Sequence, residues 1–181
     1  MKKFLKSVFL IILILVVFRG PVYRLFINYK NIGTREKIEI TNQELIKLIN
    51  AKSANRHIDA EAVADIANQM AKDELSFTWG NASNNPNELI ISHKANCIGY
   101  SATFNSIANY LIAKNGLESE IQTRHIIGKL YFWGIDVHQL FSNPFFKDHD
   151  FNQIRDLKTG KTISIDPSIG DYLWIDEVSA E

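Results

Sequence analysis

The clearest pattern in the chain is an apolar stripe between positions 97 and 114, repeating at i, i+3, i+4, i+7 and i+8, the spacing of one helix face. Its members are Phe104, Ile107, Ala108, Leu111 and Ile112. Asn96 stands before the stripe as a favourable N-cap residue, and Asn115 and Gly116 follow it as a stop signal. The pattern therefore predicts a helix whose first residue is Cys97.

Two further helical patterns precede this one. The sequence "TNQE" at 41–44 fits a capping box and predicts a helix from about 42 to 51. The sequence at 58–75 predicts a second helix, with Asp59 as its N-cap. A short strand is expected at 75–78, and the asparagine-rich stretch at 80–88 is expected to be a polar loop.

After Gly116 the pattern changes to one typical of strands. Residues 120–133 are rich in β-branched and aromatic side chains, and 136–143 are expected to continue the same hairpin. Residues 149–167 alternate on either side of a turn signal, "KTG", which predicts a second hairpin. A last short strand is expected at 171–176. Helices followed by antiparallel strands indicate an α+β domain.

The N-terminus has a different composition. Three lysines precede an unbroken apolar run at 8–18, which is the layout of a signal sequence or signal anchor. A buried core helix is the alternative, but the lysines and the all-round apolarity argue against it. No A-x-A-like site follows, so we favour an uncleaved transmembrane signal anchor over 1–20, although it is short for a bilayer. A juxtamembrane connector is expected over 21–38, and the folded domain over 39–181, outside the cytoplasm.

Composition narrows the possible functions. Lys plus Arg and Asp plus Glu both number 20, which gives no electrostatic reason to expect a nucleic-acid partner. A single cysteine excludes an intramolecular disulfide and a multi-thiolate metal site. A metal site that combines His138 with residues 148–150 lacks a recognisable ligand spacing. We therefore expect no metal and no cofactor.

Cys97 is the first candidate for chemistry. A helix N-terminus carries partial positive charge and free N–H groups, and both favour a thiolate, the nucleophilic form of cysteine. The same N–H groups can hold an oxyanion. A lone cysteine on an apolar helix face is more often a packing residue, however, so Cys97 alone does not establish a catalytic role.

The C-terminal hairpin supplies two further groups. His149 opens its first strand and Asp166 ends its second strand, so the turn brings them to the same end of the hairpin. The sequence does not fix the register, because a bulge changes which face each side chain takes. With Cys97 on a helix tip, the three residues form a predicted nucleophile, base and orienting acid.

These segments resemble the transglutaminase-like superfamily, which has a papain-like cysteine fold. "NCIGYSATFNSIANYL" at 96–111 is similar to the family's nucleophile segment, and "HDFNQIRDLKTGKTISIDPS" at 149–168 is similar to its histidine segment. The resemblance covers about 93–171. It implies a nucleophile-bearing helix packed on a C-terminal antiparallel sheet, with Cys97 as nucleophile, His149 as base and Asp166 as orienting acid.

Some positions depart from the family pattern or lack an assignment. Phe151 stands where Trp is commoner in the family, and the residue that completes an oxyanion hole is not identified. The candidates upstream are Trp79, Asn84 and Asn85. The sequence "NPFF" at 143–146 is read as a packed loop, with the lining of a substrate cleft as the alternative. Gly99 and Tyr100 are expected to let the helix start pack closely on the sheet.

The resulting expectation is a membrane-anchored cysteine enzyme that transfers acyl groups from a peptide or protein substrate through a thioester. Hydrolysis of peptide or amide bonds is favoured over transamidation, by family analogy. A non-catalytic peptide-binding module tethered to the membrane is the first alternative. The second is a small structural membrane protein, in which Cys97 and His149 would lie far apart.

Overall fold

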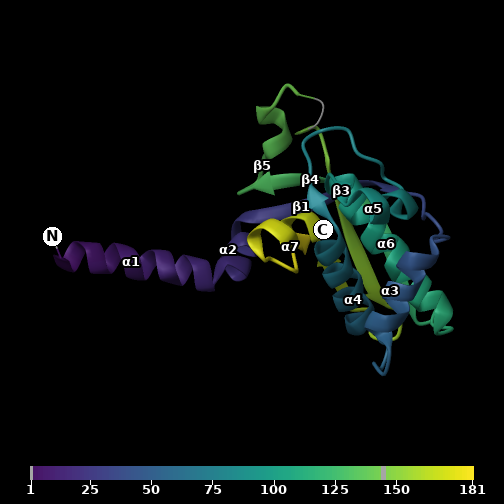
Figure 1. Ribbon diagram of the computed structural model, residues 1–181. Coiled ribbons are helices and arrows are strands. Elements are labelled where there is room, and N and C mark those ends of the chain that lie inside the picture. The colour runs from purple at the N-terminus through teal and green to yellow at the C-terminus, as the bar shows by residue number, and fades with distance from the viewer. Residues whose placement is uncertain (1, 144–145) are drawn as a thin grey trace.

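The computed structural model of the protein describes residues 2–143 and 146–181 (Figure 1). The N-terminal half contains α1 (Lys2–Val17), α2 (Arg19–Phe26), β1 (Ile27–Arg35), α3 (Gln43–Ser53), α4 (Ala60–Glu74), β2 (Ser76–Phe77), α5 (Pro86–Ser92), β3 (Lys94–Ala95) and α6 (Cys97–Lys114). The C-terminal part contains β4 (Ile121–Phe132), β5 (Ile135–Asp136), the 3₁₀ helix η1 (Val137–Leu140), β6 (His149–Asp156), β7 (Thr162–Ile165), α7 (Pro167–Leu173) and β8 (Ser179–Ala180). The predicted α+β class is confirmed.

The main sheet has the strand order β7-β6-β4-β1-β8, and β5 pairs with the end of β4. Neighbouring strands run antiparallel, except that β1 and β8 are parallel. A register shift between Asn31 and Gly33 separates the two halves of the β1–β4 ladder. β2 and β3 form a separate two-stranded parallel pair beside the start of α6.

The larger hydrophobic core surrounds α6, which packs against β6 and β4 on one side and against α4 on the other (Figure 1). Along α6 the apolar stripe is fully or almost fully buried, including Phe104, Ile107 and Leu111. Small residues fill most of the remaining turns and let α4 and the sheet approach closely. This packing fixes the position of the α6 N-terminus relative to the sheet.

A smaller core lies around Tyr29, Ile126, Phe151 and Val178. Ile126 and Phe151 are directly paired between β4 and β6. A Cβ atom at Gly128 would lie only 2.7 Å from the Phe151 ring, so the glycine makes room for this aromatic side chain. The smaller core thus ties β1 to the strand that begins with His149.

The helix boundaries follow their caps. Asn42, Asp59 and Asn96 each accept hydrogen bonds from backbone N–H groups of the first helical turn, which confirms the predicted starts of α3, α4 and α6. Some element predictions are wrong. Residues 136–143, expected to continue the hairpin, contain only the end of β5, which is followed by the 3₁₀ helix η1 and a loop. The polar loop expected at 80–88 ends early, because Asn85 caps α5 and Pro86 occupies its first turn.

The strand expected at 171–176 is also a wrong prediction. Asp166 caps a helix there, Pro167 occupies its first turn, and α7 continues to Leu173. The aromatic residues that suggested a strand lie on this short helix and just after it. The last strand is instead β8, which adds to the edge of the sheet beside β1.

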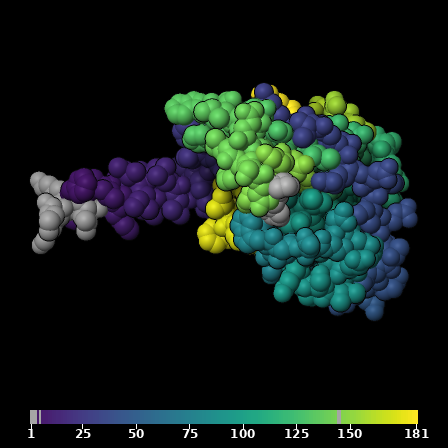
Figure 2. Space-filling model, turned by 90° about the horizontal axis from the view of Figure 1, so that it is seen from above, coloured from purple at the N-terminus to yellow at the C-terminus, as the bar shows by residue number. Residues whose placement is uncertain are grey.

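The segment expected as a connector, 21–38, contains β1, which pairs along β4 inside the main sheet. It is therefore part of the folded domain. Before it, α1 projects from the body of the protein as an isolated rod (Figures 1 and 2). Within the described residues no single helix is both long and apolar enough to cross a membrane, whereas Lys6–Val17 and Arg19–Phe26, bent by 78°, meet the criterion as a pair.

Candidate active site

Cys97 lies at the first position of α6. The Asn96 side chain accepts hydrogen bonds from the backbone N–H groups of Ile98 and Gly99, at 3.1 and 3.2 Å, and so fixes the first turn. The Cys97 side chain is buried, with 8% of its surface exposed. Its own backbone N–H has no hydrogen-bond acceptor within the described part of the chain. This free donor points to the chemistry of an oxyanion site.

Gly99 allows the close packing that holds this turn. A Cβ atom there would lie 2.9 Å from the Ala95 Cβ, 3.1 Å from Leu89 Cδ1 and 3.1 Å from the Ser83 carbonyl oxygen. The helix start therefore packs against α5, β3 and the preceding loop. The prediction that it packs against the sheet is wrong at Gly99. Tyr100 donates a hydrogen bond to Asp171, at 2.6 Å, and ties α6 to α7.

His149 and Asp166 meet at one end of the β6–β7 hairpin. Asn152 pairs with Ile165, so Asp166 falls beside Phe151 and diagonally across from His149 on the same face. The carboxylate Oδ2 of Asp166 lies 2.6 Å from Nε2 of His149. The alternation across the hairpin thus brings together two residues that are 17 positions apart.

The second ring nitrogen of His149 is left for Cys97. Cys97 lies close enough to the imidazole to affect its pKa, and since Asp166 takes Nε2, Nδ1 is the ring nitrogen left for the sulfur. Burial alone would lower the pKa of His149, but the negative charge and hydrogen bond of Asp166, together with Cys97, raise it well above its usual range. A protonated imidazole beside the sulfur favours a thiolate–imidazolium pair.

Asp166 is fully buried, and both of its oxygens are engaged. Oδ1 accepts hydrogen bonds from the backbone N–H groups of Ser168 and Ile169 and from the Ser168 hydroxyl, at 2.7–3.1 Å. Oδ2 accepts one from the Tyr29 hydroxyl, at 2.8 Å, besides that from His149. Burial raises the pKa of Asp166, but the His149 charge and these hydrogen bonds outweigh it, so the pKa lies below its ordinary value.

Tyr29 is a member of this site that the sequence did not reveal, because it lies in the segment expected as a connector. It is fully buried on β1, its ring packs edge-on against His149 at 5.9 Å between centroids, and its hydroxyl also pairs with that of Tyr23 at 2.7 Å. Burial and the Asp166 charge raise the pKa of Tyr29 well above its ordinary value, so its hydroxyl stays protonated and donates. The alternation of side chains along 27–35, which is typical of a strand, is the sequence signal that identifies β1 and places Tyr29 in the sheet.

A cavity of about 420 Å³ opens beside Cys97 and His149. Its walls are mainly apolar and aromatic: Phe77, Trp79, Leu130, Val137, Phe141, Phe146, Ile169, Tyr172 and Leu173. Phe146, in the segment 143–146 that was expected to be a packed loop, therefore lines the cavity. Positions 144 and 145 lie outside the described residues. The cavity is large enough for a side chain of a peptide or acyl group.

The three candidates for the oxyanion hole have different positions. Trp79 lines the cavity beside Cys97. Asn84 lines a separate hollow with Arg35 and His125 on the far side of the helix tip. Asn85 accepts a hydrogen bond from the Asn87 backbone N–H as the cap of α5. Of the three, only Trp79 therefore shares a cavity with the sulfur.

A second buried ionic cluster, which no sequence pattern predicted, lies next to His149 along β6. Asp150 is fully buried, with its carboxylate 2.7 Å from His125 Nε2 and bridged by Nε and Nη2 of Arg35, at 2.5 and 3.1 Å. Burial raises the pKa of Asp150, but His125 and Arg35 lower it below its ordinary value overall. The sequence "DHD" at 148–150 suggests only a metal site without a recognisable ligand spacing, and not this ionic cluster.

The described residues contain no group of three or more His, Cys, Asp or Glu side chains arranged to hold a metal ion. His138 is buried and accepts a hydrogen bond from the Leu130 backbone N–H, while its Nδ1 lies 2.7 Å from the Phe146 carbonyl oxygen. His93 ends α5, with its ring against the Glu74 carbonyl oxygen. These histidines thus have structural partners of their own.

A comparison with protein-family models gave no match, and a search among curated proteins found no similar sequence.

Proposed function

We propose that the protein is a cysteine-dependent acyl-transfer enzyme that acts on peptide or amide bonds. The observation that carries the proposal is the 2.6 Å contact between Asp166 and His149, with Cys97 at a helix N-terminus lining the same cavity as this imidazole. A nucleophile, a base and an orienting acid in this order are what thioester chemistry requires. The adjoining cavity gives the acyl portion of a substrate a place to bind.

The first half of the reaction forms the thioester. His149 Nδ1 takes the proton of the Cys97 thiol, and the thiolate attacks the carbonyl carbon of the substrate. The backbone N–H of Cys97 donates to the developing oxyanion. As the tetrahedral intermediate collapses, the carbon–nitrogen bond breaks, and His149 gives its proton to the departing amine.

The second half releases the acyl group. His149, now neutral, takes a proton from water, and the resulting hydroxide equivalent attacks the thioester carbonyl carbon. The carbon–sulfur bond breaks, a carboxylic acid leaves and Cys97 recovers its proton. An amine in place of water would give transamidation. We favour hydrolysis by analogy with the transglutaminase-like family, whose papain-like fold we propose for this domain.

The membrane anchor forms part of the same proposal. α1 is an exposed apolar helix of 16 residues, about 24 Å long as an α-helix, against roughly 30 Å of bilayer hydrocarbon. The side chains of Lys6 near one end and Arg19 at the other can extend towards the headgroups, which makes up the shortfall in helix length. We propose a single-pass tether with the folded domain outside the cytoplasm.

The test is the rate at which iodoacetamide alkylates Cys97 in the detergent-solubilised full chain, measured against pH. The thiolate–imidazolium pair predicts fast alkylation that persists at mildly acidic pH. His149→Ala removes the proton acceptor, so its profile should move to higher pH. His57→Ala, at an exposed histidine far from the sulfur in sequence, is the control and should leave the profile unchanged.

An unchanged profile in His149→Ala would remove the physical basis of catalysis. A tethered, non-catalytic module that binds apolar peptide segments in the same cavity would then be the better account. If the profile does shift, the next assay is hydrolysis of amide and peptide substrates, with and without an added amine acceptor, by wild type and Cys97→Ser.

A further inference from the structure

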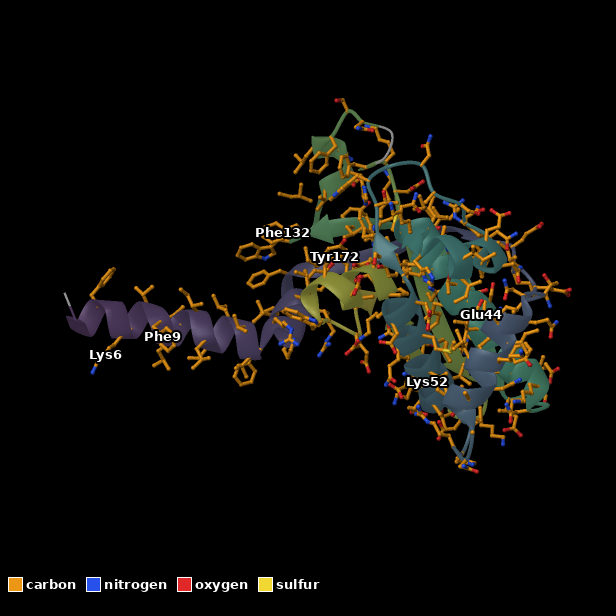
Figure 3. The ribbon with its side chains drawn as sticks, viewed as in Figure 1. Lys6, Phe9, Glu44, Lys52, Phe132 and Tyr172 are labelled. Carbon is orange, nitrogen blue, oxygen red and sulfur yellow. The ribbon has the colours of Figure 1, made fainter. Side chains whose placement is uncertain are left out.

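Large apolar side chains lie exposed at the base of α1. We name this group the aromatic rim: Leu25, Phe132, Trp133, Ile135, Leu173 and Trp174. Trp133 and Trp174 have 77% and 68% of their surfaces exposed. Figure 3 shows the labelled Phe132 and Tyr172 on the side of the body from which α1 projects, whereas Glu44 and Lys52 lie farther from α1.

α2 holds the two halves of the rim together. At its C-terminal end, the Phe26 carbonyl oxygen accepts a hydrogen bond from the Trp133 backbone N–H, at 2.9 Å, and the Phe26 ring packs edge-on against Trp133. At its N-terminal end, Arg19 Nε donates to the carbonyl oxygens of Leu173 and Trp174. The Arg19 guanidinium also lies over the Trp174 ring. The rim is therefore fixed to the point where α1 leaves the domain.

Both rim tryptophans have unfavourable backbone conformations. Trp133 and Trp174 each have a φ of 52°, in the left-handed region. For a bulky residue this left-handed conformation is rare and energetically unfavourable. Glycine at either position would relieve that strain. Backbone conformation therefore does not explain why tryptophan occupies these two exposed positions.

Charge favours an anionic surface at the same place. Arg19 and Arg24 lie on α2 beside the rim, and none of the 20 acidic residues lies in the first 35 positions. Two of the acids near Trp174 have partners within the domain, since Asp171 accepts from Tyr100 and Asp176 from Lys72. Basic residues beside exposed indoles are typical of surfaces in contact with lipid headgroups.

We infer that the aromatic rim rests in the headgroup region of an anionic bilayer, with Trp133 and Trp174 inserted beside the entering α1 helix. This inference rests on the anchor in the proposed function and adds the orientation of the domain. Two residues of α7, Tyr172 and Leu173, line the cavity of Cys97 next to the rim. The cavity therefore opens near the lipid surface and takes peptide or amide bonds held close to it.

The experiment is tryptophan fluorescence of the full chain reconstituted into vesicles of phosphatidylcholine and phosphatidylglycerol, with lipids brominated near the headgroup as quenchers. Each variant keeps a single tryptophan, at 133 or 174, with the other native tryptophans replaced by Phe. The matched control has all three replaced by Phe and carries Lys52→Trp on the far side of the domain. The emission of the rim tryptophans should shift to the blue and lose intensity, and the control emission should do neither.

Three results would overturn the inference, and they differ in meaning. If the chain stays with the vesicles but neither rim tryptophan is quenched, the anchor stands and the docking surface is wrong. If the chain does not associate with vesicles at all, both the anchor and the surface are wrong. In either case the alkylation profile of Cys97 in detergent still tests the catalytic proposal by itself. Quenching of the control as strongly as of Trp133 would indicate non-specific collapse onto lipid, which also contradicts the inference.

Discussion

At the scale of single residues, the site depends on how one buried carboxylate is surrounded. Asp166 sets the charge state of His149, and Tyr29, Ser168 and Ile169 hold the carboxylate in place. A buried charge without such partners would be strongly unfavourable. In the proposed mechanism, the reactivity of Cys97 therefore depends on residues that contact Asp166 rather than the sulfur.

Asp166→Asn should lower the pKa of His149. The substitution keeps the shape but removes the negative charge that raises this pKa, while the burial that lowers it remains. In the folded wild-type protein the pKa of His149 is higher than the pKa of the same residue in the unfolded chain. Protonated His149 therefore contributes fully to the free energy of unfolding below about pH 6.5, and this contribution is lost as the pH rises through the folded-state pKa. The measurement is an NMR titration of the His149 Cε1–H signal. An unchanged titration would mean that Asp166 does not control the imidazole.

Tyr29→Phe should lower the free energy of unfolding by about 1–3 kcal/mol, because it removes a buried donor to a charged group. It should also slow alkylation of Cys97 by loosening Asp166 and His149. Tyr110→Phe is the matched control, since that hydroxyl makes only a 3.4 Å contact with Asn50. Equal effects of the two variants in denaturant unfolding would rule out a special role for Tyr29.

At the scale of elements, the position of the sulfur is set by the start of α6. Gly99→Ala should both destabilise the protein and reduce the reactivity of Cys97, because the new Cβ would collide with Ala95, Leu89 and the Ser83 backbone. Gly33→Ala on β1 is the control, since its nearest neighbour would be the Ile127 side chain at 3.6 Å. Thermal unfolding and the alkylation rate check the two effects. A fully reactive Gly99→Ala variant would show that the helix start tolerates displacement.

The second ionic cluster ties β1, β4 and β6 together. Asp150→Asn should destabilise the protein by roughly 3–5 kcal/mol, because it leaves Arg35 and the buried His125 without their shared anion. Asp73→Asn removes an exposed partner of Lys52 and should change stability by less than about 1 kcal/mol. Denaturant midpoints compare the two. A small effect at Asp150 would mean that solvent replaces the lost carboxylate.

Sequence patterns predicted those elements whose signals are local. Caps such as Asn96 and Asp59 act within one helical turn, so they fixed the helix starts correctly. The meeting of His149 with Asp166 followed from one turn and strand alternation. What depended on distant pairing was missed: β1 reads as a connector until β4 lies beside it, and Tyr29, Arg35 and His125 acquire their roles only in the sheet. The strand expected at 171–176 failed because the cap at Asp166 outweighed aromatic β-propensity.

At the scale of the whole molecule, α2 joins the folded domain to its N-terminal helix. α2 contacts both the hairpin tip at Trp133 and the end of α7 at Trp174, while α1 extends away from them (Figures 1 and 2). The cavity, the rim and the base of α1 thus lie on neighbouring parts of the surface. Under the proposed function and membrane orientation, this arrangement favours bonds presented along a membrane over those of free peptides.

The boundary of the folding unit gives the last prediction. A fragment that begins at Arg19 retains α2 and β1, so it should unfold at nearly the same temperature as the full chain and keep the alkylation profile of Cys97. A fragment that begins at Gly33 lacks Tyr29 and most of the ladder to β4, which leaves β4 as an open edge and Asp166 without its tyrosine donor. It should unfold at a markedly lower temperature or fail to fold, as measured by circular dichroism. Equal stability of the two fragments would mean that the folded domain begins after β1, where the sequence alone had placed it.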